Sequence, residues 1–64
     1  MNEIDRLIEK FKLAQGDYDK MRGFRRSLTV WSQKREKETG TKALYFIRAF
    51  KMRVTKEGLD AVAV

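Results

Sequence analysis

The feature that most constrains the fold is the absence of cysteine and histidine, the residues that stabilise many small domains through disulfide bonds or bound metal ions. The chain has 64 residues and contains neither Cys nor His. A disulfide is therefore excluded, and so are the Cys- or His-ligated zinc and iron–sulfur sites that support many domains of this size. A chain this short buries only about 60% of its unfolded surface. We expect one domain over residues 1–64 with a thin core, no cofactor and no metal.

An amphipathic helix is predicted over residues 3–22. Its apolar residues recur at helical spacing, and Asn2 is placed to cap the first turn. Gly16 and Asp17 would allow the helix to stop and restart, although one helix weakened at Gly16 fits the pattern equally well. The apolar stripe consists of Ile4, Leu7, Ile8, Phe11, Ala14, Tyr18 and Met21. This stripe between Ile4 and Met21 could also pair with a second copy to give a homodimer.

The middle of the chain, residues 24–38, fits either a helix or a strand. A helical stripe is formed by Met21, Phe24, Leu28 and Trp31. The run over residues 28–31 is nevertheless rich in strand-favouring types. Gly40 is equally ambiguous, since it suits the turn of a hairpin or the C-cap of a helix.

The last third favours strands. From residue 50 the side chains alternate, with Phe50, Met52 and Val54 on one face and Lys51, Arg53 and Thr55 on the other. Residues 54–59 fit a turn with a Gly bulge, and residues 59–64 would form the returning strand. A helix over residues 42–54 is the competing interpretation, because its apolar residues also fit the helical period.

The fold class predicted from these segments is α+β. An N-terminal helix, broken or unbroken at Gly16, would pack on a small antiparallel sheet of two or three strands from the C-terminal half. The alternative is an all-α three-helix bundle with breaks near Gly16 and Gly40.

Charge and composition predict a binding protein and not an enzyme. The chain has 15 Lys and Arg against 9 Asp and Glu, a formal net charge of +6. Without His or Cys, neither Ser27 nor Ser32 has an imidazole partner, so no catalytic residue is predicted.

Summed along the sequence, residues 1–20 carry a net charge of −1, whereas residues 21–40 carry +4 and residues 41–64 carry +3. The positive charge is therefore expected in the second two-thirds of the chain.

Basic residues interleaved with aromatic ones are typical of nucleic-acid-binding surfaces. The candidate binding residues are Arg22, Arg25, Arg26, Trp31, Lys34, Arg35, Arg48, Lys51 and Arg53. Trp31 and Tyr45 would stack on bases if they were exposed. No motif for reading base sequence is present, so phosphate contacts would dominate.

The predicted function is that of a small, non-enzymatic accessory protein that binds nucleic acid. The alternative is a protein-interaction module, a regulator or inhibitor that docks on an acidic partner protein. No apolar run approaches the ~20 residues of a membrane span, and the N-terminus lacks the basic and apolar regions of a secretory signal. We therefore expect an intracellular, cytoplasmic protein with no membrane partner. Its size, charge and acidic start resemble those of many small accessory proteins of phages and mobile elements.

Overall fold

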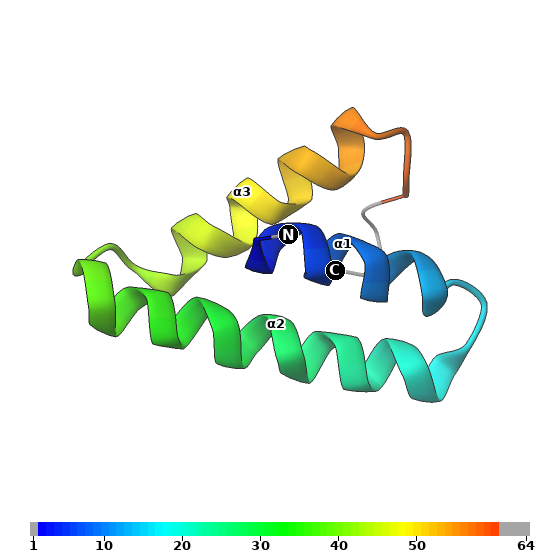
Figure 1. The fold of residues 1–64 in the computed structure, drawn as a ribbon, viewed down its shortest axis with the longest axis horizontal. Coiled ribbons are helices and arrows are strands. Elements are labelled where there is room, and N and C mark those ends of the chain that lie inside the picture. The colour runs from blue at the N-terminus through cyan, green and yellow to red at the C-terminus, as the bar shows by residue number, and fades with distance from the viewer. Residues whose placement is uncertain (1, 61–64) are drawn as a thin grey trace.

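The computed structural model describes residues 2–60, which fold into three α-helices (Figure 1). The helices are α1 (Glu3–Leu13), α2 (Tyr18–Thr39) and α3 (Ala43–Lys56). No strand occurs among the described residues, so the predicted α+β fold is wrong and the alternative three-helix bundle is correct. The long helix α2 packs against both α1 and α3, which lie above it in Figure 1.

The first helix ends earlier than predicted, at Leu13, and a short turn leads into α2. Gly16 in this turn has φ +77°, a left-handed conformation that ends a helix and that glycine adopts without steric cost. Asp17 then caps α2, because its side chain accepts a hydrogen bond from the backbone N–H of Lys20 at 3.1 Å. The single helix over residues 3–22 is therefore wrong, and the stop and restart at Gly16 is correct.

The second turn, which joins α2 to α3, is held by one backbone and one side-chain capping hydrogen bond. Gly40 has φ +76°, and its N–H donates to the carbonyl of Glu36 at 2.8 Å, so this glycine is a helix C-cap and not a hairpin turn. The carboxylate of Glu36 accepts a hydrogen bond from the N–H of Ala43 at 2.8 Å. An acid at a helix N-terminus is favourable, so one residue of α2 stabilises the start of α3.

Burial explains why the C-terminal third is a helix and not a pair of strands. Phe50 and Val54 are both completely buried, and they lie four residues apart, on one face of α3. Met52 lies between them and is 73% exposed. A strand would have placed all three side chains on the same face. The observed burial therefore follows the period of a helix and not that of a strand.

The predicted turn over residues 54–59 and the returning strand over residues 59–64 are also corrected. The helix α3 continues to Lys56, and residues 57–60 follow it without strand structure. Residues 61–64 of the predicted strand lie outside the described residues.

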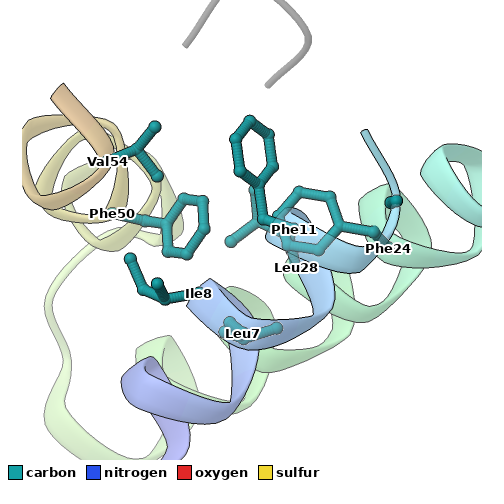
Figure 2. Close-up of a cluster of buried hydrophobic side chains, with 8 residues drawn as sticks. Leu7, Ile8, Phe11, Phe24, Leu28, Phe50 and Val54 are labelled. Carbon is teal, nitrogen blue, oxygen red and sulfur yellow. The ribbon is translucent and has the colours of Figure 1, made fainter. Parts of the chain in front are cut away.

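Three phenylalanines, one from each helix, form the centre of the core (Figure 2). The ring centroids of Phe11 and Phe24 are 5.2 Å apart, those of Phe24 and Phe50 5.4 Å, and those of Phe11 and Phe50 6.1 Å. Such spacings are favourable for aromatic pairs beyond the area that they bury. The remaining buried apolar residues are Leu7, Ile8, Ala14, Leu28 and Val54. Because all three helices contribute a ring, the core holds the whole bundle together.

The apolar stripe between Ile4 and Met21 faces this core. Leu7, Ile8 and Phe11 are buried, and Ile4 and Met21 pack against the buried cluster. Apart from Tyr18, which is 73% exposed, the stripe that could have paired with a second copy is therefore covered within the chain.

Candidate anion-binding surface

A trough between α1 and α2 gathers basic side chains from both helices. It consists of two adjoining hollows of about 460 and 390 Å³, which share Lys10 and Ser27. Five cationic residues line it, namely Arg6, Lys10, Lys20, Arg26 and Lys34. We call this surface the basic trough. All five of these residues are exposed.

Helical spacing explains how these residues meet. Arg6 and Lys10 lie four residues apart, one turn along the same side of α1. On α2, Lys20, Ser27 and Lys34 recur every seven residues, or two turns, on the side that faces α1. At a rise of about 1.5 Å per residue, the trough extends about 21 Å from Lys20 to Lys34. Two short helical stripes therefore form one elongated cationic surface.

The floor of the basic trough is apolar. Leu7 and Phe24 are buried beneath it, whereas Val30 is 59% exposed and Leu13 is 72% exposed at its sides. Trp31 is half-buried and also lines the trough. An anion bound to the cations would therefore lie beside apolar side chains at the surface of the protein.

The charges of the trough are not neutralised within the described part of the chain. Glu3 is the one acidic residue among its lining residues. Within residues 2–60, no carboxylate forms an ion pair with a cation of the trough; the ion pairs found there join Lys12 to Glu9, Arg35 to Glu38, and Arg53 to Asp5 and Glu57. The trough therefore carries a local excess of positive charge.

Three of the nine residues predicted from the sequence line the trough. These are Arg26, Trp31 and Lys34. Arg22 lies close by, because it lines a smaller hollow with Asp19 and Arg26. Arg25 is exposed on α2 but is not among the lining residues of the trough.

Two other predicted residues make contacts within the bundle. The guanidinium of Arg53 lies 3.0 Å from the carboxylate of Asp5 in α1 and 3.9 Å from that of Glu57. Arg35 lies 3.2 Å from the carboxylate of Glu38, and its guanidinium carbon is 5.6 Å from the ring centroid of Phe46. Both guanidinium groups therefore already have partners within the bundle and are less available to a ligand.

The last two predicted residues, Arg48 and Lys51, are exposed on α3 and lie away from the trough. Lys51 and Arg53 were expected to share a strand face, but on a helix residues two apart point about 200° away from each other. Lys51 and Arg53 line a hollow of about 590 Å³, and all of its described lining residues belong to α3. Because its lining among the described residues comes from one helix, this hollow is a weaker candidate site than the trough.

Sequence reasoning missed three of the five cations, Arg6, Lys10 and Lys20. All three lie within residues 1–20. Because this segment has a net charge of −1, the binding residues were predicted in the rest of the chain. The acids of this segment, apart from Glu3, lie outside the trough. A helical projection of residues 3–13 would have shown Arg6 and Lys10 one turn apart.

Comparison with known proteins finds no match for the chain. No protein-family model matches it, and neither a curated protein nor a solved structure matches it. None of the helices in residues 2–60 is long and apolar enough to cross a membrane. The fold and the surface together define the chain as a small basic three-helix protein with a cationic trough.

Proposed function

We propose that this protein binds nucleic acid, chiefly through phosphate contacts in the basic trough. The observation that carries the proposal is that two helices bring five cations and one acid to a single elongated surface. This role involves binding without catalysis, as expected for a chain that has no His and no Cys. A nucleic-acid ligand also fits the intracellular location predicted from the sequence.

The two types of cation would contribute differently. Arg6 and Arg26 offer planar guanidinium groups that can donate two parallel hydrogen bonds to one phosphate. Lys10, Lys20 and Lys34 offer mobile point charges that follow a phosphate backbone without fixing its register. Neither contact reads base sequence, so the protein would bind with little sequence preference.

The test is the salt dependence of binding to fluorescently labelled oligonucleotides, measured by anisotropy. Five phosphate contacts to a single strand predict a slope of about −3.5 for the logarithm of affinity against the logarithm of salt concentration. That slope corresponds to a loss of roughly 130-fold between 50 and 200 mM salt. Absence of binding at low salt would contradict the proposal.

The second candidate function is docking on an acidic partner protein. One observation favours it: Leu44 is 56% exposed and Met52 is 73% exposed on α3, on either side of Arg48. Apolar side chains around an arginine are common in protein interfaces. If no oligonucleotide binds at low salt, this candidate replaces the first.

A further inference from the structure

A further hollow adjoins the basic trough at the end where α1 begins. Its volume is about 450 Å³, and it shares Glu3 and Trp31 with the trough. Three aromatic residues line it, Trp31 from α2 and Tyr45 and Phe46 from α3, together with Arg35. We call it the aromatic hollow. A ligand lying in the trough would reach this hollow without leaving the surface.

The rings of the aromatic hollow are arranged around Phe46. The centroids of Trp31 and Phe46 are 5.8 Å apart, those of Tyr45 and Phe46 are 5.4 Å apart, and both pairs are edge-to-face. Arg35 lies 5.6 Å from the centroid of Phe46. Tyr45 is 62% exposed, whereas Trp31 and Phe46 are half-buried.

This cluster differs from the core cluster in its exposure. The three core phenylalanines are at most 2% exposed, whereas all three rings of the hollow are open to solvent in part. Exposed rings beside a cationic groove are the combination with which single-strand-binding proteins hold bases and backbone together.

We propose that the aromatic hollow stacks an unpaired base of a single-stranded nucleic acid whose phosphates lie in the basic trough. This inference rests on the proposed function and adds the class of nucleic acid to it. Bases of a duplex are already stacked and paired, so a base can enter the hollow only from a single strand or after extrusion. Five cations over about 21 Å give one per about 5 Å. A stacked strand carries one phosphate per about 3.4 Å of its axis, so the trough could pair with most but not all of the phosphates that lie over it.

The test uses Trp31, the one tryptophan in the chain, as an internal probe. A dT oligonucleotide of about twelve nucleotides, within the site sizes of single-strand-binding domains, is compared with a duplex of the same length and with a poly-glutamate peptide. Binding is followed by anisotropy, and stacking by quenching of Trp31 fluorescence. We expect the single strand to bind most tightly and to quench Trp31.

The chain offers a matched pair of tyrosines as variant and control. Tyr45 is 62% exposed in the hollow, and Tyr18 is 73% exposed at the start of α2, outside the lining of the trough and the hollow. Tyr45→Ala should weaken single-strand binding about 5-fold or more, as expected for loss of a stacked ring. Tyr18→Ala should leave it unchanged, and Tyr45→Phe should restore it. Thermal unfolding of each variant verifies that it is folded.

The outcomes separate this inference from the proposed function. Oligonucleotide binding without Trp31 quenching, equal affinity for the duplex, or equal effects of Tyr45→Ala and Tyr18→Ala would overturn the single-strand inference and leave phosphate binding intact. No oligonucleotide binding at low salt, or tighter binding of poly-glutamate, would overturn both.

Discussion

Neutralising two cations of the basic trough should reduce the salt dependence of oligonucleotide binding. The double variant Arg26→Gln with Lys34→Gln removes two of the five cations that line the trough. At about 0.7 per phosphate contact on a single strand, the slope of log affinity against log salt should change from about −3.5 to about −2.1. Between 50 and 200 mM salt, affinity should then fall roughly 20-fold, where the unmodified protein loses roughly 130-fold.

A control with the same change of charge is available on α3. Arg48→Gln with Lys51→Gln also removes one arginine and one lysine, both exposed, but neither lines the trough. Anisotropy titrations at four or more salt concentrations would give the slope for each protein. The α3 variant should keep a slope near −3.5, because its cations are expected to touch no phosphate. Equal reductions in both variants would refute the trough as the site and indicate an effect of net charge alone.

Three predictions concern the bundle itself. Phe11→Ala should destabilise the bundle by about 3–5 kcal/mol and lower the thermal midpoint, followed by circular dichroism, by about 12 °C or more. Leu13→Ala, a change at an exposed site of the same helix, should shift stability by less than about 0.5 kcal/mol. Gly40→Ala should destabilise by about 1 kcal/mol or more, since φ is +76° there, and should lower the thermal midpoint by about 4–8 °C. Gly23→Ala should instead raise the thermal midpoint, because Gly23 is helical and an added Cβ would meet nothing within 4 Å. A lower thermal midpoint would contradict the assignment of an unstrained helix at this position.

Local signals predicted the start of the first helix and the positions of both turns, but left the role of each glycine open. Asn2 caps α1 as expected, accepting a hydrogen bond from the N–H of Asp5 at 2.9 Å. Gly40 is the C-cap of α2, and Gly16 lies in the left-handed conformation in the turn between α1 and α2, which agrees with one of the two interpretations of each glycine. These signals are readable because caps and left-handed glycines depend on a few neighbouring residues.

The third helix was mispredicted because it is apolar on more than one face. Tyr45 and Met52 are exposed, so the buried stripe through Phe50 and Val54 does not stand out from its surroundings. The β-favouring types in this segment then suggested strands, a preference that packing against α2 overrides. Only the tertiary contacts distinguish the buried face from the exposed one.

The basic trough was only partly predicted from the sequence, for a similar reason. Arg26 and Lys34 lie in a segment with clear positive charge, whereas Arg6 and Lys10 lie in a segment whose acids offset them. The two helices are separate in sequence, and their charges combine only when α1 packs against α2. A sum along the chain cannot detect a surface that is built across two helices.

The most direct measurement of the proposed site is a map of backbone amide chemical shifts during titration with a dT oligonucleotide. The largest changes should occur in the basic trough, around Lys10, Arg26 and Ser27, with little change at Arg48 and Met52 on α3. Changes concentrated on the part of α3 outside the aromatic hollow, or spread evenly over the bundle, would contradict the assignment of the trough as the nucleic-acid-binding surface.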